Sequence, residues 1–255
     1  MFTRVCPTCG EEFTTDNPRK IFTNKQCADR SRNLPAIPPG YEGEVELKHF
    51  NKFPPDVKRR VLQGETNHKI VFFDLECTSL KPTVGRILCA SFVTMDGEPY
   101  TFSALDRKFK TPDVYDDSKL AIAIRDELEK YDLIFGWNSK DFDLKFLNSR
   151  LLRVGERIKE AQYHLDGMWS FRSKSSAWSK LDSVQKFILP EGETKTEIEW
   201  EKWMRALGWD RKMRNEAMAS IVEHCEHDVL VSREVYGRLA SADVFRSLRK
   251  DGGIL

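Results

Sequence analysis

The segment KIVFFDLE at residues 69–76 constrains the fold more than any other part of this chain. It is a nearly continuous apolar run, which is typical of a strand buried on both faces of a sheet. Two acids, Asp74 and Glu76, interrupt its end. Because successive side chains of a strand alternate between faces, both acids point to the same face. The pattern predicts a central strand whose end carries a charged site.

Two further acids follow apolar segments, Asp143 in IFGWNSKDFDLKFL and Asp228 in IVEHCEHDVLVSREVY. Two carboxylates about 4 Å apart repel by roughly 4 kcal/mol at an effective dielectric of 20. Acids gathered from four places therefore imply bound cations. Oxygen ligands suit Mg²⁺ or Mn²⁺, and two such ions about 3.5–4 Å apart support phosphodiester hydrolysis.

Each acid taken alone also has an ordinary structural explanation. A single D-x-E pair on a strand is usually a surface ion pair. Asp143 in the first turn of a helix suits the helix dipole. Asp228 and His224, four residues apart on one helix face, can form a structural pair. Only the four acids together, in their order and context, favour a metal site.

From Lys69 onward the sequence alternates between strand and helix patterns. Strands are expected at 69–76, in a hairpin over 85–105 that turns at Asp96-Gly97, at 132–138 and at 163–171. Helical periodicity covers 118–131, 141–155, 179–188, 196–208 and 214–240. This order predicts an α/β fold, with a mixed five-stranded sheet flanked by helices.

Composition excludes some classes of protein. The chain has 255 residues, 40% of them hydrophobic, and a net charge of +1, so a globular protein with no strong electrostatic preference is expected. No apolar run approaches the roughly 20 residues that span a bilayer, and MFTRVCPTCG does not resemble a signal peptide. We expect a cytoplasmic, reducing location with no membrane partner. Three scattered cysteines, Cys77, Cys89 and Cys225, are then expected to be buried as apolar side chains.

The chain before the sheet divides into two parts. Residues 1–30 are expected to form a small lobe, in which CPTCG is a tight turn between two short strands. Residues 31–67 contain the Pro-rich segment NLPAIPPGYEGE and are expected to be a linker with a short helix interrupted by Pro54 and Pro55. The main domain then covers 68–255.

The lobe has an incomplete zinc-binding pattern. Cys6 and Cys9 have the C-x-x-C spacing that holds one structural Zn²⁺ from a tight turn, but only Cys27 follows. Either the site takes a fourth ligand from elsewhere, such as His49, or the lobe is a metal-free remnant of a zinc ribbon. A bound Zn²⁺ would stabilise a lobe too small for a core of its own.

The chain resembles the DEDD superfamily of 3′–5′ exonucleases, which have a ribonuclease H-like fold. The resemblance covers roughly residues 68–240 and is greatest to the proofreading domains of family B DNA polymerases and their free-standing relatives. FDLEC matches the first motif (F-D-x-E-T), NSKDFDLKFL matches the second (N-x3-F-D-x2-F-L), and HCEHDVLVSREVY matches the third.

The resemblance implies a two-metal 3′–5′ exonuclease acting on DNA, with single-stranded ends as the expected substrate. Two Mg²⁺ or Mn²⁺ ions would be held by the four acids, Asp74, Glu76, Asp143 and Asp228. The expected substrate contacts are Asn138, which leads the second motif, and Thr78. We expect a free-standing nuclease or a subunit with an unknown replication or repair partner. An exoribonuclease of the same chemistry and a weak nucleic-acid-binding module on the same fold are the alternatives.

The third motif departs from both large groups of the superfamily. One group has Tyr four residues before the last acid, and the other has His five residues before it. Here His224 lies four residues before Asp228, and Glu223 lies five before. We favour His224 as the general base, with His227 or a base-free mechanism as the alternatives. Cys77 also replaces the usual Thr of the first motif, which leaves the role of the Thr78 hydroxyl open.

Several other side chains are candidates for supporting roles. Asp141 is expected to cap the helix that follows it, Asp166 is a candidate for approaching the site, and His164 is expected to be structural. Basic residues form two groups, either solvated faces or a phosphate track: Lys48, Lys52, Lys58, Arg59 and Arg60, and then Arg172, Lys174, Lys180, Arg211, Lys212 and Arg214. Nearby aromatic residues, Trp169, Phe171 and Trp178, either pack in the core or stack on bases.

Overall fold

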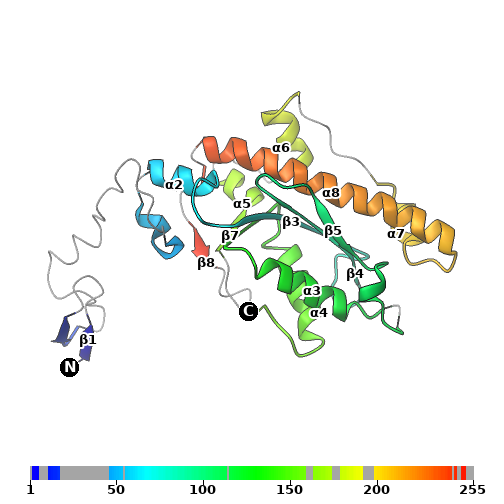
Figure 1. Cartoon of the computed structure of the whole chain (residues 1–255), viewed down its shortest axis with the longest axis horizontal. Coiled ribbons are helices and arrows are strands. Elements are labelled where there is room, and N and C mark those ends of the chain that lie inside the picture. Colours follow the sequence, from blue (N-terminus) through cyan, green and yellow to red (C-terminus); the bar gives the residue numbers. More distant parts are fainter. Residues whose placement is uncertain are drawn as a thin grey trace.

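The structure is a computed structural model of the chain (Figure 1). It describes residues 2–5, 11–17, 46–53, 55–113, 115–158, 163–173, 179–191, 198–242, 244–245 and 248–250. The strands are β1 (Phe2–Val5), β2 (Glu12–Thr15), β3 (Ile70–Cys77), β4 (Ile87–Thr94), β5 (Tyr100–Ser103), β6 (Leu133–Gly136), β7 (Tyr163–Asp166) and β8 (Arg249–Lys250). The helices are η1 (Leu47–Lys52), α2 (Pro55–Leu62), η2 (Arg107–Phe109), α3 (Ser118–Leu128), α4 (Asp143–Leu152), α5 (Gly167–Arg172), α6 (Leu181–Ile188), α7 (Trp200–Arg205) and α8 (Arg211–Ser241).

The main sheet has the order β5-β4-β3-β6-β7-β8. β4 is antiparallel to β3 and to β5, whereas β6 runs parallel to β3 and to β7. The predicted mixed five-stranded sheet is confirmed, and the two-residue strand β8 extends it at the β7 edge. Because β3, β6 and β7 are parallel, their carboxyl ends meet at one edge, where α/β proteins usually place their sites.

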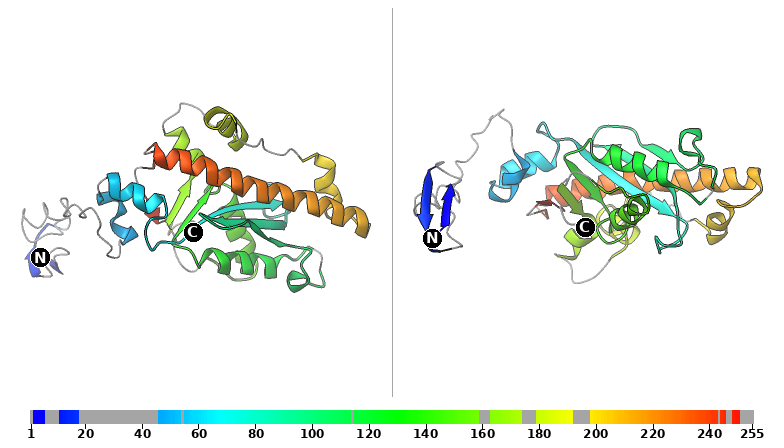
Figure 2. Two further views of the ribbon diagram at one scale, coloured as in Figure 1. Left: turned by 45° about the horizontal axis from the view of Figure 1, so that its top comes forward. Right: turned by 90° about the horizontal axis from the view of Figure 1, so that it is seen from below.

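The two faces of β3 belong to two different layers of the core. Ile70 and Phe72 pack with Val229 and Tyr236 of α8, and the rings of Phe72 and Tyr236 meet edge to face at 5.1 Å. Val71, Phe73 and Leu75 pack instead against the layer formed by α3 and α4. Figure 2 shows α8 crossing one face of the sheet while α3 and α4 cover the other. β3 is therefore buried on both sides, as its apolar run predicts.

Helix α8 is 31 residues long, which corresponds to about 46 Å. Its first turn is capped by Asp210, whose carboxylate accepts a hydrogen bond from the Met213 N–H at 2.8 Å. Ile221 and Cys225 pack on β4, and residues further along pack on β3 and β6. The middle of α8 therefore crosses the end of β3 that carries the two acids.

The segment expected to be a linker is partly built into the main core. Phe50 of η1 and Val61 and Leu62 of α2 are buried in the same cluster as Phe72. The Tyr236 hydroxyl also donates a hydrogen bond to the Leu62 carbonyl. η1 and α2 thus pack onto the domain that the sequence assigned to residues 68–255. β1 and β2 pair as an antiparallel hairpin, as expected for the N-terminal lobe.

One strand is shorter than the sequence pattern indicates. The expected strand over 163–171 ends at Asp166, and Gly167–Arg172 forms α5. The Asp166 carboxylate accepts a hydrogen bond from the Trp169 N–H at 3.1 Å and so caps this helix. A Cβ atom on Gly167 would lie 2.5 Å from the Trp137 ring, so only glycine fits where the chain turns from strand to helix. Trp169 consequently belongs to a short helix rather than to an apolar strand.

Candidate active site

The end of β3 supplies the first two acids. The same alternation that turns Ile70 and Phe72 toward α8 also turns Asp74 and Glu76 toward that helix. On the face of β3 that meets α8, the two carboxylates therefore follow directly after the apolar side chains. The pairing of β3 with β4 shifts register between Glu76 and Cys77, which is the irregularity that often re-aims side chains beside an active site.

The middle of α8 supplies the facing residues. His224 Nε2 lies 3.7 Å from a Glu76 carboxylate oxygen and 3.8 Å from an Asp228 carboxylate oxygen. The ligand atoms of these three residues all lie within 4.8 Å of one another. The four-residue spacing of His224 and Asp228 therefore places both on the face of α8 that meets β3. Neither of the two clusters of metal-ligating side chains found among the described residues includes His227.

Asp143 reaches the same region from the other layer. It is the first residue of α4 and so lies in the first turn of that helix, as the sequence predicts, and only 4% of it is exposed. Its carboxylate accepts a hydrogen bond from the Leu75 N–H at 3.1 Å. Burial, and then the negative charge of Asp74, raise the pKa of the Asp143 carboxyl well above its usual range. Asp143 is therefore held against the backbone of β3, close to Asp74, at a site where another negative charge is unfavourable.

Cys225 is part of the site, which the sequence pattern does not indicate. Its Sγ lies 3.5 Å from Asp74 Oδ2, and the ligand atoms of Asp74, Glu76 and Cys225 lie within 4.8 Å of one another. Burial, a hydrogen bond with Cys89, and the charges of Cys89, Asp74 and Glu76 raise the pKa of the Cys225 thiol. The thiol therefore stays protonated and can donate to the Asp74 carboxylate. The prediction that Cys225 is buried is confirmed, but it is not merely apolar filling.

The loop after β6 is held by Asp166. The Asp166 carboxylate accepts hydrogen bonds from the Asn138 N–H at 3.2 Å and the Lys140 N–H at 2.9 Å, in addition to that from Trp169. This carboxylate therefore positions the backbone of the loop, and its negative charge also contributes to raising the pKa of the Asp143 carboxyl. Asn138 has a φ of 62°, a left-handed conformation that Asn adopts more readily than most residues. His164 is structural as expected, because its Nε2 lies 2.8 Å from the Ser139 hydroxyl.

Asp141 does not cap α4, contrary to expectation. The residue at the N-cap is Phe142, and the Asp141 carboxylate instead accepts hydrogen bonds from Lys145 and from the Trp169 indole, each between 2.7 and 2.8 Å. These contacts lower the pKa of Asp141, with the Lys145 bond as the largest cause. The two acids of the second motif thus have opposite environments, Asp143 buried beside Asp74 and Asp141 paired with a cation at the surface.

Thr78 closes the turn that leads from the site to β4. Its hydroxyl accepts a hydrogen bond from the Arg86 N–H at 3.0 Å, and its own N–H donates to the Arg86 carbonyl at 3.0 Å. A buried ion pair supports this turn, because Arg150 binds Asp117 at 2.6 Å and donates to the Pro82 carbonyl at 3.0 Å. Its hydrogen bonds with Arg86 therefore hold Thr78 in place close to Glu76, which lies two residues before it.

The remaining sequence candidates are placed as follows. Arg211, Lys212 and Arg214 lie on the first turn of α8, and the Arg172 guanidinium lies 5.6 Å from the Trp169 ring. Cys6, Cys9, Cys27, Lys174 and Trp178 lie outside the described residues. His49 is described, and its Nε2 lies 3.8 Å from a Glu46 carboxylate oxygen.

Comparison with known proteins agrees with this arrangement. The family model of the RNase_H superfamily matches residues 71–240, which is more than half of the chain and includes all four acids. The chain belongs to the RNase H superfamily. This membership supports nuclease activity in general. All residues of the carboxylate cluster lie within the matched region. No curated protein matches the chain.

A solved structure supports the RNase H-like fold. The family B DNA polymerase from the hyperthermophilic archaeon Pyrobaculum calidifontis is similar, with a TM-score of 0.50 and 16% sequence identity. The similarity covers 69% of this chain and 26% of the polymerase, so the matched part of this chain corresponds to about a quarter of that protein. Among the described residues, no helix has the length and apolar character needed to cross a membrane.

Proposed function

We propose that this RNase H superfamily protein is a metal-dependent 3′–5′ exonuclease that removes nucleotides from single-stranded DNA ends. The observation that carries the proposal is the cluster at the end of β3. Glu76, His224 and Asp228 place their ligand atoms within 4.8 Å of one another. Asp74 and Cys225 form a second cluster with the same Glu76, and its ligand atoms also lie within 4.8 Å of one another. Three carboxylates and an imidazole converge there from two elements far apart in the sequence.

The donor set of this site fits Mg²⁺ or Mn²⁺. Carboxylate oxygens predominate, as these hard cations prefer, and burial together with the charge of Asp74 raises the pKa of Asp143. The residues that would hold two such ions are Asp74, Glu76, Asp143 and Asp228. When bound, the ions would polarise the phosphate and stabilise the negative charge that develops on the leaving 3′ oxygen.

The protein's own residues would position and deprotonate the attacking water. His224 Nε2 lies between the carboxylates of Glu76 and Asp228, at 3.7 and 3.8 Å. The imidazole would take a proton from the water while the water oxygen bonds to phosphorus. The bond between phosphorus and the 3′ oxygen would break in the same step. Solvent would protonate that oxygen, and a nucleoside 5′-monophosphate would leave. Cys225 would hold the Asp74 carboxylate in place.

The direction of digestion and the choice of DNA rest on the resemblance of all three motifs to the DEDD exonucleases. The fold similarity to a family B DNA polymerase is consistent with that resemblance. Asn138 and Thr78 would contact the substrate strand. Asn138 lies in the loop that precedes Asp143, and Thr78 lies two residues after Glu76. A replication or repair protein is the expected class of partner, and the cellular site is expected to be the cytoplasm.

An end-labelling experiment tests this proposal. Oligonucleotides of DNA and of RNA, single- or double-stranded and labelled at the 3′ or 5′ end, are incubated with the full chain and Mg²⁺ or Mn²⁺. We expect the 3′ label to be released first as a mononucleotide, and 5′-labelled single-stranded DNA to shorten stepwise. Release of the 5′ label first would contradict the polarity. Faster digestion of RNA than of DNA would contradict the proposed substrate.

A further inference from the structure

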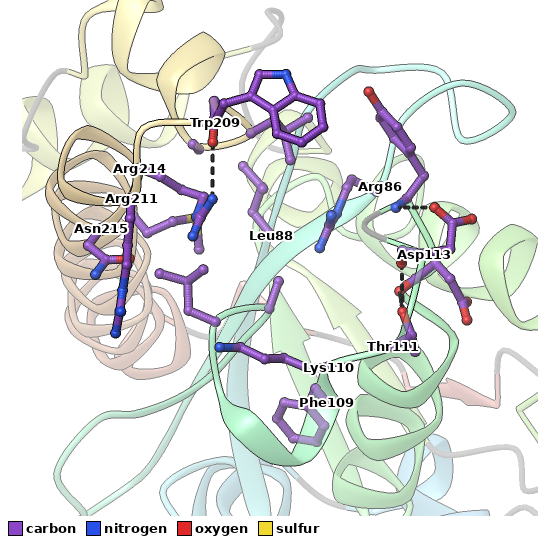
Figure 3. Close-up of a pocket in the computed structure, with 18 residues that line it drawn as sticks. Arg86, Leu88, Phe109, Lys110, Thr111, Asp113, Trp209, Arg211, Arg214 and Asn215 are labelled. Carbon is purple, nitrogen blue, oxygen red and sulfur yellow. Dashed lines mark hydrogen bonds between the residues drawn. The ribbon is translucent and has the colours of Figure 1, made fainter.

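A pocket of about 630 Å³ lies beside the first turns of α8, at the start of β4. Its size is typical of sites for one small molecule or one unit of a polymer. Figure 3 shows Arg211, Arg214 and Asn215 on one wall and Arg86 and Asp113 on the other, with Leu88 between them. The proposed mechanism gives this pocket no role.

The lining has an excess of positive charge. Four cationic side chains line the pocket, Arg86, Lys110, Arg211 and Arg214, against two acids, Asp113 and Asp116. The Nε atom of Arg86 is buried, and it has no hydrogen-bond partner within the part of the chain that the structure describes. Burial lowers the pKa of Arg86 from its ordinary value. Arg211 and Arg214 lie on the wall opposite Arg86 and Asp113, so that wall is suited to an anionic group.

The pocket also offers an aromatic face. Trp209 lies in the turn before α8, and 98% of it is exposed. Figure 3 shows its indole at the mouth of the pocket, above Leu88. Leu88, Leu105 and Met218 supply an apolar floor. A tryptophan so exposed has no role in core packing, and its flat ring is suited to stacking on a nucleobase.

The pocket is connected to the catalytic cluster in two ways. Arg86 is hydrogen-bonded through its backbone to Thr78, which follows Glu76 by two residues. Met218 lines the pocket and lies six residues before His224 on α8, a rise of about 9 Å along the helix. A strand bound at the carboxylates therefore needs only a few nucleotides to reach the pocket.

We propose that this pocket binds one nucleotide of the substrate strand on the 5′ side of the bond being cut. Its base stacks on Trp209, and its phosphate pairs with Arg211 and Arg214 on α8. The two acids lie across the pocket, beside Arg86, where they accept hydrogen bonds from N–H groups of the base edge. This inference rests on the proposed nuclease function. It favours a strand over a free nucleotide because Arg86, which lines the pocket, is hydrogen-bonded through its backbone to Thr78, two residues beyond Glu76.

Equilibrium binding tests the proposal. Fluorescein-labelled oligo(dT) of 3 to 20 nucleotides is titrated with the full chain in EDTA, which prevents hydrolysis. We expect Kd to fall sharply at a threshold length of a few nucleotides and to change little beyond it. Trp209→Ala should raise Kd about 5-fold or more above that length, and Trp209→Phe should retain most of the affinity. Arg211→Ala should reduce the slope of log Kd against log salt by about 0.7.

Two matched controls separate the pocket from general surface effects. Lys212→Ala removes the same charge from the neighbouring residue, and Trp200→Ala removes a tryptophan that is 68% exposed on α7. Neither residue lines the pocket, so both variants should bind as wild type does. Substrates shorter than the measured threshold length should be hydrolysed equally by wild type and Trp209→Ala, because they do not reach the pocket.

The outcomes distinguish this inference from the proposed function. If wild type digests DNA but Trp209→Ala and Lys212→Ala bind long oligonucleotides equally well, the pocket inference is wrong and the nuclease proposal stands. If deoxyadenosine monophosphate alone binds at the Trp209 site as tightly as the 20-mer, the pocket takes a free nucleotide and the strand assignment is overturned. If wild type neither binds nor digests any oligonucleotide, the proposed function itself is wrong.

Discussion

Replacing Asp143 with asparagine should stabilise the metal-free protein while abolishing hydrolysis. Asparagine has nearly the shape of aspartate, and its carbonyl oxygen can still accept the hydrogen bond from the Leu75 N–H that the carboxylate accepts at 3.1 Å. What the substitution removes is a titratable carboxyl that is 4% exposed and lies beside Asp74, where its ionised form is unfavourable. A residue that ligates a cation is expected to reduce stability when the cation is absent.

The size of the effect follows from the pKa of Asp143. Burial and Asp74 raise this pKa well above the unfolded value, so the folded site keeps a proton that the unfolded chain has lost. The contribution of Asp143 to stability is therefore present below the unfolded pKa and is lost as pH rises toward the folded pKa. Across that window the free energy of unfolding falls by about 1.4 kcal/mol per pH unit.

Urea unfolding in EDTA, at intervals from pH 4 to pH 8, measures this effect as a difference between variant and wild type. The advantage of Asp143→Asn should grow with pH and then level off at the folded pKa. Asp141→Asn is the matched control, because the pKa of Asp141 is lowered by Lys145. Its stabilising contribution is present above the unfolded pKa, so this variant should be slightly less stable at pH 7, by about 1 kcal/mol or less for a surface pair.

Adding Mg²⁺ should reverse the order of stability. Binding to the folded state stabilises wild type in proportion to RT ln(1 + [Mg²⁺]/Kd), and Asp143→Asn should gain less. If the stability difference between Asp143→Asn and wild type in EDTA does not change from pH 4 to pH 8, the pKa of Asp143 is not raised in the folded protein and the reasoning fails.

Four further predictions follow from the site and the elements around it. His224→Ala should slow hydrolysis about 10²- to 10⁴-fold, whereas His227→Ala should change it little; a larger loss for His227→Ala in steady-state kinetics would exchange their roles. Asp117→Ala breaks a buried ion pair with Arg150 at 2.6 Å, so thermal unfolding should show a loss of about 3–5 kcal/mol. Asn138→Gly keeps the left-handed backbone at φ 62° and should unfold like wild type but hydrolyse about 10-fold more slowly if its amide contacts substrate. Elemental analysis should find zinc in the full chain and lose it in Cys6→Ser; equal zinc in both would contradict a cysteine site in the lobe.

The parts of the site that follow from regular geometry could be predicted from the sequence. Alternation along a strand places Asp74 and Glu76 on one face, and the four-residue spacing on a helix places His224 beside Asp228. Both predictions concern side chains on long, buried elements whose period the apolar residues define. The distances of 3.7 and 3.8 Å around His224 Nε2 confirm that these two elements meet there.

The parts that depend on tertiary contact could not be predicted. In the sequence, Cys225 looks like any cysteine in a buried helix. Only the packing of α8 on β3 brings its thiol to Asp74. Asp141 stands where a helix cap is common, yet Lys145 and Trp169 offer its carboxylate better partners.

The pocket beside α8 and the packing of the expected linker were missed for a similar reason. The pocket combines β4, the segment around residues 104–116, and the start of α8, and no sequence period connects them. Phe50 lies in a Pro-interrupted segment with no clear pattern, but its burial at 0% exposure ties that segment to the main core.

The most direct test of the central claim is hydrolysis of 5′-labelled single-stranded DNA by wild type and by Asp228→Asn, measured with Mg²⁺ and with EDTA. Asp228 is 4% exposed and belongs to the cluster with Glu76 and His224. We predict stepwise shortening by wild type in Mg²⁺, none in EDTA, and none by a folded Asp228→Asn variant in either. Wild-type turnover by Asp228→Asn, or equal digestion with and without Mg²⁺, would contradict the assignment of this cluster as a metal-dependent nuclease site.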